Sequence, residues 1–524
     1  MKRLCTIILF SLACHPAAAQ VTDSLFQKAY GGTNNETGAG LYATQDGGFI
    51  LAGSTQSYSS GLFGGDAYLI RTDSNGAILW TKVYGEPDTD EKTQAVIQTK
   101  DKGFLLLANY REIATQDDYM LLVRTDSSGE LLWSRSLLGS GSAVHQTADD
   151  GFVIGGSTVQ PSVGGSDLYL VKTDPNGLTN WARSYGTLAD EYAVDLKIAD
   201  NGYILAGNIL SGSTASDILM LYLDFGGNIL WEQTYGDTNE NVAASVVENA
   251  GGGFTVLTNT RDLSTSDYQL NLLKLDANGT LNMVKSLGGN GTDIGYTLQK
   301  VAGSGFVMSG VSSSYKPYDL KTWLCLLDTA FNVSWSRTYN EHSSQQVPNR
   351  VVTTLSGGYG ILGTVQYTGG MEDLLFIKTD GDGGTWCFDS LQVPPITAAS
   401  WSSTSIALQW LDGSTAGFHQ GLTDTGGIVY TICQNTTSIA DEPSGISFDV
   451  YPNPAKDMVK FSGVFKTGST IRIFSVDGRL ADEVSADKPV VTVALRGVPA
   501  GAYYFQAQLN DGSFRTGKLI ITGN

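Results

Sequence analysis

A phrase of about 50 residues returns seven times along this chain of 524 residues, and it constrains the fold more than any other feature. In the first copy a run of β-branched and aromatic residues ends at Asp73, and Trp80 follows after a short turn. Successive tryptophan positions are separated by 53, 48, 50, 52, 52 and 51 residues. The positions are Trp80, Trp133, Trp181, Trp231, Met283, Trp335 and Trp386. This constant period predicts a repeat array.

Each copy contains four short runs that alternate with turn residues. In the first copy the runs are 41–44, 49–54, 68–72 and 78–84, and clusters of Gly, Asp and Asn separate them. Such runs are typical of strands joined by tight turns. Four antiparallel strands in about 50 residues is the size of one propeller blade. The sequence therefore predicts an all-β protein in which residues 20–390 form a seven-bladed β-propeller.

The segment before the first copy offers a way to close the ring. Residues 25–31 have the pattern of a fourth strand, as a comparison with 79–85 shows, but the three strands that should precede them are missing. In a ring, such a strand can complete the last blade and leave no exposed sheet edge. We therefore expect residues 25–31 to pair with the last copy.

The phrase Asp-x-x-Gly-x-x-x-Trp, seen at 73–80 and 126–133, resembles the tryptophan-docking motif of quinoprotein-like propellers. Structural roles account for its residues. Aspartate and asparagine favour the turn, glycine adopts a positive φ, and the indole fills the space between blades. Nothing else in the sequence points to a quinone, so no cofactor is predicted.

The N-terminus has the features of a secretory signal over residues 1–19, with cleavage expected between Ala19 and Gln20. A lipoprotein box at 11–14 is the alternative interpretation. No later segment approaches the roughly 20 apolar residues that span a bilayer, so no transmembrane segment is predicted. The 32 Lys and Arg residues stand against 52 Asp and Glu, a net charge of −20, which excludes sequence-independent nucleic-acid binding.

Three cysteines remain after the signal. Cys387 and Cys433 flank the segment that follows the repeats and could form a disulfide, which would leave Cys325 as a buried apolar residue. No cluster of Cys and His with ligand spacing occurs in the sequence, so no metal site is assigned.

Long loops are expected on one rim of the propeller and tight turns on the other. Function on a rigid scaffold usually resides on its long loops. Carboxylates recur on the long-loop rim, before the third strand of each copy and between blades. These predicted ligand-binding residues are Asp66, Asp90, Glu91, Asp167, Asp217, Asp267, Asp319 and Asp373.

Two interpretations of these carboxylates stay open. In the first, they accept hydrogen bonds from loop amides and are structural. In the second, they bind a cationic ligand or calcium, with residues 88–91 as the best local candidate. The sequence holds no complete calcium-binding loop, so calcium is not assigned as a cofactor.

The periodicity stops after residue 390. Residues 391–445 are rich in Thr, Ser and Gly, and we expect a partly ordered connector that lies against the propeller. Residues 446–524 alternate short strands with turns, which predicts a small Ig-like β-sandwich.

The last module also resembles the type A C-terminal sorting domain of the type IX secretion system. The resemblance rests on motifs that span the module, namely Tyr451, Pro452, Asn453, Pro454, Asp477, Gly478, Gly501, Tyr503, Gly517 and Lys518. It implies that the type IX machinery is a partner and that the protein ends outside the cell or on the outer-membrane surface.

These features together predict a secreted or cell-surface propeller that acts as a binding or scaffold module for an extracellular glycan or protein. The alternative is a glycosidase or lyase that uses carboxylates of the long-loop rim on a polysaccharide. Acidic pairs with raised pKa values on that rim would favour the enzyme, whereas aromatic and amide side chains would favour the binder. No nucleophile motif is present in the sequence, so no catalytic residue is assigned and a non-enzymatic role is favoured.

Overall fold

In the computed structural model, every regular element among the residues that the structure describes is a β-strand, as the all-β prediction requires. The chain divides into two compact units, Met1–Thr437 and Ser438–Asn524. The structure describes residues 24–59, 64–86, 89–112, 116–210, 215–303, 305–315, 320–339, 345–367, 370–385, 389–392, 394–399, 401–406, 408–412, 417–418, 422–424, 428–436, 449–451, 455–456, 458–462, 465, 468, 470–475, 480–486, 488–495, 498–499, 501–508 and 514–521.

The described part of the first unit forms seven five-stranded antiparallel sheets, which we number 1 to 7 in chain order of their first strands. From first to last strand, sheet 1 is β2 (Glu36–Ala43), β3 (Phe49–Thr55), β4 (Asp66–Thr72), β5 (Ile78–Gly85) and β34 (Leu422–Asp424), and sheet 2 is β6 (Lys92–Gln98), β7 (Phe104–Arg111), β8 (Asp118–Thr125), β9 (Leu131–Leu138) and β33 (Gly417–Phe418). Sheet 3 is β10 (Ser140–Gln146), β11 (Phe152–Thr158), β12 (Asp167–Thr173), β13 (Thr179–Gly186) and β32 (Gln409–Asp412). Sheet 4 is β14 (Glu191–Ala199), β15 (Gly202–Leu210), β16 (Ser216–Leu223), β17 (Ile229–Gly236) and β31 (Ser402–Ser405).

Sheets 5 to 7 follow the same plan. Sheet 5 is β18 (Glu240–Glu248), β19 (Phe254–Arg261), β20 (Tyr268–Leu275), β21 (Leu281–Leu287) and β30 (Ile396–Ala398). Sheet 6 is β22 (Asp293–Val301), β23 (Gly305–Ser312), β24 (Lys321–Leu327), β25 (Val333–Tyr339) and β29 (Asp389–Leu391). Sheet 7 is β26 (Gln345–Thr353), β27 (Tyr359–Gln366), β28 (Glu372–Thr379), β1 (Ser24–Gly31) and β35 (Ile428–Thr436).

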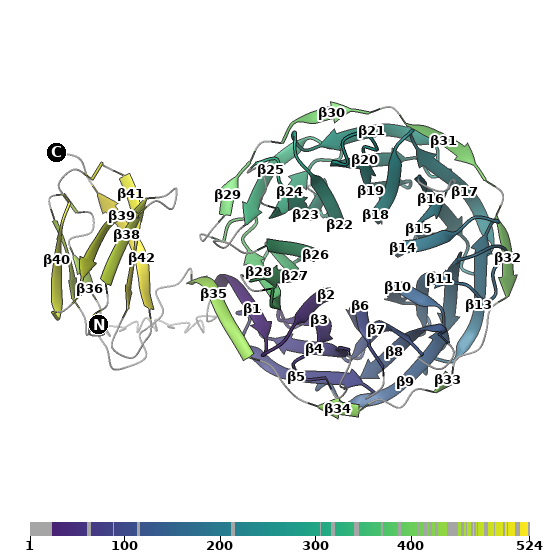
Figure 1. Ribbon diagram of the computed structural model, residues 1–524, viewed down its shortest axis with the longest axis horizontal. Helices are drawn as coiled ribbons and strands as arrows, with labels where there is room; N and C mark the ends of the chain where they lie inside the picture. The colour runs from purple at the N-terminus through teal and green to yellow at the C-terminus, as the bar shows by residue number, and fades with distance from the viewer. Residues whose placement is uncertain are drawn as a thin grey trace, which may run out of the picture. The chain divides into compact units, whose positions relative to one another are not determined.

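The sheets follow one another around a ring, with the first strand of each sheet toward the centre (Figure 1). Each first strand contacts the first strand of the next sheet, from β2 through β22 to β26, and β26 contacts β2. The N-terminal strand β1 is the fourth strand of sheet 7, where Phe26–Tyr30 pairs antiparallel with β28. The two ends of the repeat array therefore meet in one sheet.

Residues 389–436 form an outer belt, which we define as β29 to β35. The belt runs around the ring in the direction opposite to the sheets: β29 pairs with β25 of sheet 6, the next strands pair with sheets 5, 4, 3, 2 and 1 in turn, and β35 pairs with β1 (Figure 1). The segment expected to be a connector thus supplies a fifth strand to every sheet. A fifth strand covers backbone groups that would otherwise form an open edge.

The turn that follows the third strand is built in the same way in all seven sheets. In sheet 1 the Asp73 carboxylate accepts hydrogen bonds from the amides of Asn75 and Ala77, both at 2.8 Å, and Gly76 has a φ of +70°. Aspartates with the same pair of amide bonds are Asp73, Asp126, Asp174, Asp224, Asp276, Asp328 and Asp380. The recurring aspartate therefore fixes the turn.

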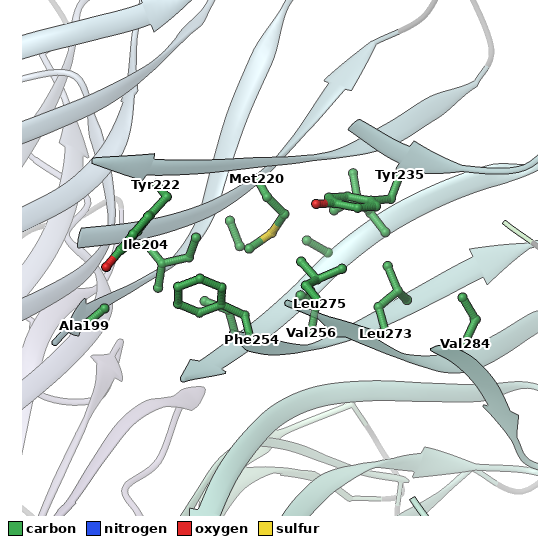
Figure 2. Packing of buried hydrophobic residues seen from close by; sticks show 14 residues of the cluster. Ala199, Ile204, Met220, Tyr222, Tyr235, Phe254, Val256, Leu273, Leu275 and Val284 are labelled. Carbon is green, nitrogen blue, oxygen red and sulfur yellow. The ribbon is translucent and has the colours of Figure 1, made fainter. Parts of the chain in front are cut away.

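The recurring tryptophan packs against the turn of the next sheet. A Cβ at Gly129 would lie 2.9 Å from the Trp80 ring, and the Tyr84 hydroxyl donates to the Gly129 carbonyl at 2.7 Å. Apolar side chains of neighbouring sheets share continuous cores, as Figure 2 shows for Met220 and Tyr235 of sheet 4 beside Val256 and Leu273 of sheet 5. The wedge between sheets is thus filled by side chains of both.

A hydrogen bond between sheets recurs beside a β-bulge in the first strand. At the junction of sheets 5 and 6, the Gly295 amide donates to Asn259 Oδ1 at 2.8 Å, and Asn259 Nδ2 donates to the Gly295 carbonyl at 2.9 Å. The corresponding amides of Gly38, Thr93, Gly141, Ala193 and Ala243 donate to Thr364, Ser54, Asn109, Ser157 and Asn208. We call these six contacts the junction bonds. The bond from Gly38 to Thr364 joins sheets 1 and 7.

The seventh junction has no such bond and also has no need for one. The residue of β23 that corresponds to Asn259 is the buried Val311, which has no acceptor. The residue of β26 that corresponds to Gly295 is Pro348, which precedes the same register shift and has no N–H to donate. Donor and acceptor are therefore missing together.

The described part of the second unit has a three-stranded and a four-stranded sheet. The strands are β36 (Asp449–Tyr451), β37 (Met458–Ser462) and β40 (Val490–Ala494) in the first sheet, and β39 (Leu480–Ser485), β38 (Thr470–Ser475), β41 (Gly501–Gln508) and β42 (Phe514–Ile521) in the second. Phe461 of the first sheet and Phe505 of the second are in edge-to-face contact, with ring centroids 5.0 Å apart. The two sheets thus share one core.

Replacing Asn259 by valine should lower the free energy of unfolding by about 2 kcal/mol, because a buried N–H and a buried C=O lose their partner. Urea unfolding of the full chain measures this change. At the seventh junction, Val311→Asn should also destabilise, and adding Pro348→Ala should recover part of the loss by supplying a donor. A neutral Asn259→Val, or no recovery in the double variant, would show that the junction bonds do not stabilise the ring.

Candidate functional site

Three of the predicted ligand-binding aspartates lie at the start of third strands and are buried. Asp66 and Asp167 are the first residues of β4 and β12, and Asp373 is the second residue of β28; their exposed fractions are 1%, 0% and 8%. A glycine at the end of a fourth strand makes room for each carboxylate. A Cβ at Gly186, for example, would lie 2.2 Å from the Asp167 carboxyl carbon.

A second buried polar residue stands at the start of the first strand in the next sheet. Glu36, Glu91, Glu191, Asn241, Asp293 and Gln346 occupy this position and are all fully buried. Three of them face an aspartate of the preceding sheet, so the ring holds three carboxyl pairs: Asp66 with Glu91, Asp167 with Glu191, and Asp373 with Glu36. Glu91 is one of the predicted ligand-binding residues, but its pairing with Asp66 was not predicted.

Burial decides the protonation of these pairs. Loss of solvent and the neighbouring Asp66 raise the pKa of Glu91 to about 7. Burial raises the pKa of Asp373 to about 6, with further contributions from the charge of Glu36 and a hydrogen bond to its carboxyl group. Burial likewise raises the pKa values of Asp167 and Glu191. The Glu91 carboxyl group is therefore partly protonated near neutral pH.

The same carboxyl groups organise the long loops. Glu36 accepts hydrogen bonds from the amides of Gly32 and Ser57 at 2.7 and 3.0 Å and from the Thr55 hydroxyl at 2.8 Å. Asp167 accepts one from the amide of Val163 at 2.8 Å. These contacts agree with the structural interpretation of the recurring carboxylates, and binding of a ligand by them stays a prediction.

Other predicted site residues are placed differently. Asp90 and Asp267 are exposed; Asp90 accepts a hydrogen bond from the Gly65 amide at 2.8 Å and lies 3.6 Å from the Lys92 ammonium group. Asp217 is half-buried on β16. Asp319 lies outside the described residues. Within the described ranges, no group of three or more His, Cys, Asp or Glu side chains is arranged to hold a metal ion.

One polar cluster near the centre of the ring was missed. The buried Asp195 carboxylate on β14 accepts hydrogen bonds from Lys197 Nζ at 2.6 Å, Ser245 Oγ at 2.9 Å and the Val246 amide at 3.0 Å. His145 Nε2 on β10 lies 2.7 Å from the Leu196 carbonyl oxygen. An aspartate and a lysine two residues apart, within the otherwise apolar run 193–199, are the sequence signal that could have revealed this cluster.

The remaining predicted residues fall partly outside the described chain. Cys325 is buried and unpaired. Cys387 lies outside the described residues and the side chain of Cys433 is not described, so their disulfide stays a prediction. The expected cleavage site at Ala19 and Gln20 is also outside them. The described residues contain no helix that is long and apolar enough to cross a membrane.

The sorting motif is described in part. Tyr451 ends β36, and Gly501, Tyr503, Gly517 and Lys518 lie on the paired strands β41 and β42. The Tyr503 hydroxyl donates to the Pro499 carbonyl at 2.9 Å. Pro452, Asn453, Pro454, Asp477 and Gly478 lie outside the described residues.

The pairs predict a pH dependence of stability. Because the pKa of Glu91 is about 7 in the folded chain and near 4.5 in the unfolded chain, its contribution is complete below about pH 4.5 and is lost as the pH rises to about 7. This loss is at most about 3 kcal/mol. Glu91→Gln should flatten that part of the profile, and Asp267→Asn on the surface should leave it unchanged, in urea unfolding at pH 5 and pH 8. An identical profile for Glu91→Gln would contradict the assignment.

A family model described as the secretion system C-terminal sorting domain matches residues 449–522. A search of curated proteins found no match to the chain. Solved structures include PorZ, a surface component of the type IX secretion system of Porphyromonas gingivalis, at 9% identity, 93% coverage of this chain, 81% of that chain and a TM-score of 0.22. The extracellular domain of a hybrid two-component system of B. thetaiotaomicron has 10% identity, 96% and 99% coverage and a TM-score of 0.16.

TM-scores this low carry no argument, so the assignment rests on the family match alone. The match covers the second unit from its first described strand, β36, through its last, β42. It confirms the resemblance drawn from the motifs of residues 451–518. Residues 449–522 therefore belong to the family of secretion system C-terminal sorting domains, and the type IX system exports this β-repeat protein to the cell surface or outer membrane.

Proposed function

We propose that the ring is a closed seven-bladed propeller that binds an extracellular glycan or protein, and that the sorting domain is an Ig-like sandwich that brings it to the cell surface. The cyclic contacts of the first strands and the pairing of β1 with β28 support closure. The continuous core between the two sheets of the second unit supports the sandwich. Export alone is compatible with many functions, so a binding role also requires an exposed surface that could contact a ligand.

Exposed apolar side chains in the long loops carry the proposal. Leu188, between sheets 3 and 4, is 87% exposed, and Tyr192, four residues further along the chain on β14, is 43% exposed. Leu263 and Met371, in the loops before β20 and β28, are 48% and 47% exposed. Such groups on a rigid scaffold are typical of a surface that meets a ligand. Tyr192 in particular could stack on a sugar ring.

The raised pKa values of the carboxyl pairs favour the alternative, a polysaccharide-active enzyme. Glu91 and Asp167, however, are fully buried and are packed within the junctions between sheets. A general acid must come within hydrogen-bond reach of the glycosidic oxygen. A glycosidase or lyase would therefore need these junctions to open, whereas the binding role uses side chains that are already exposed.

The test is binding of the mature full-length chain to an array of polysaccharides and surface proteins, with and without calcium, combined with an assay for released sugar ends. We expect retention without release. Tyr192→Ala should weaken retention about tenfold, which corresponds to about 1.4 kcal/mol of lost stacking.

Leu132→Ser is the matched control, because Leu132 is 57% exposed on the outer strand β9, away from the long loops. Equal binding by the wild type and Tyr192→Ala would remove the long-loop rim as the binding surface. Release of sugar ends that stops on replacing Glu91 or Glu191 by glutamine would support the enzyme.

A further inference from the structure

The centre of the ring carries more positive than negative charge, from Lys197, Arg350 and Asp195, and these residues belong neither to the long-loop rim nor to the sorting domain. Each first strand has a β-bulge, and the residue after the bulge differs in character around the ring. Sheets 1 to 3 have Gly40, Ala95 and Ala143 there, and sheets 4 to 7 have Asp195, Ser245, Thr297 and Arg350. The polar side of the centre is thus built from sheets 4 to 7.

The charge of Asp195 is already satisfied. Its side chain is buried, and Lys197 Nζ lies 2.6 Å from Oδ1 as an ion pair. Ser245 and the amide of Val246 in sheet 5 donate to Oδ2. Burial alone would raise the pKa of Asp195, but the charges of Lys197 and Arg350 and these hydrogen bonds outweigh it, and the pKa lies below its ordinary value. Asp195 is therefore an anion with its full complement of donors.

Arg350 and Asp195 occupy equivalent positions, because each follows the bulge of a first strand and the first strands lie toward the centre of the ring (Figure 1). Arg350 lies on β26 of sheet 7, whose first strand contacts those of sheets 6 and 1. Its charge nevertheless acts on Asp195 of sheet 4 and on His145 of sheet 3. Within the described residues, Arg350 has no carboxylate within ion-pair distance.

His145 adds no charge at neutral pH. Burial, together with the nearby Lys197, lowers the pKa of His145 to about 4. Because the Leu196 carbonyl can only accept, Nε2 carries the ring proton and donates it at 2.7 Å. Lys197 and Arg350 thus stand against the single carboxylate of Asp195. One positive charge is in excess in a chain whose net charge is −20.

We propose that the centre of the ring, between Lys197 and Arg350, binds an oxyanion: a carboxylate, sulfate or phosphate group. A planar guanidinium offers paired N–H donors that match such a group, and an ammonium adds a second charge-assisted bond. The side chain of Lys197 is 29% exposed and Arg350 is half-buried, so solvent reaches both. The inference does not depend on the glycan proposal.

Calorimetry of the mature full-length chain with three probes tests the proposal: sodium sulfate, glucuronate and an oligogalacturonide. We expect binding of one equivalent that weakens with added salt. Sulfate alone would identify a free inorganic anion as the occupant, and tighter binding of glucuronate or the oligogalacturonide would identify an acidic sugar. Either result supports the site, and no binding of any probe overturns it.

The variant Arg350→Gln should weaken binding about tenfold, with partial recovery in Arg350→Lys. Lys488→Gln removes the same charge from an exposed position in the second unit and should bind like the wild type. Circular dichroism checks that each variant is folded. If Arg350→Gln does not fold, Arg350→Lys is compared with the wild type alone, because it keeps the charge but not the paired donors. Wild-type affinity in a folded Arg350→Gln would show that anions bind elsewhere and would overturn the proposal. The same holds for wild-type affinity in Arg350→Lys when it is the only folded variant. Binding of polysaccharides to the rim would not change this conclusion.

Discussion

The backbone amide beside each first-strand bulge is the constraint on which the ring depends. A first strand is an edge of its sheet, so half of its amides point away from that sheet and need another acceptor. Six amides find it in a serine, threonine or asparagine of the preceding sheet. At the seventh junction Pro348 removes the donor opposite Val311. At six of the seven junctions, adjacent sheets are therefore held together by a bond to an amide that would otherwise lack an acceptor.

The two ends of the first unit complete this arrangement from outside. Strand β1 joins the last sheet, and the outer belt, ending in β35, pairs with β1 along its length. Elsewhere the belt is shorter, as at β34, which pairs only with Val83–Gly85 of β5. The belt limits the open edges that could pair with another chain. It also means that the folded ring extends to residue 436 and not to 390.

The sequence predicts the elements that depend on local chemistry. Asp73 and Gly76 specify a turn wherever they recur, and the sorting motifs lie within one short module. The belt could not be predicted, because its strands pair through backbone atoms and carry no period. The burial of Asp66 depends on Gly85 and Glu91, and the central cluster depends on how neighbouring sheets pack, because His145, Asp195 and Ser245 lie on three different first strands. A period in the sequence shows that copies exist but not which side chains meet where they join.

The most direct test is hydrogen exchange at the six junction amides, Gly38, Thr93, Gly141, Ala193, Ala243 and Gly295, in the full chain. A closed ring held by these bonds predicts that all six exchange slowly and lose protection together when the first unit unfolds. Gly38 is decisive, because its partner Thr364 lies at the other end of the repeats. Fast exchange at Gly38 with the other five protected would mean an open array, and loop-like exchange at all six would contradict the account.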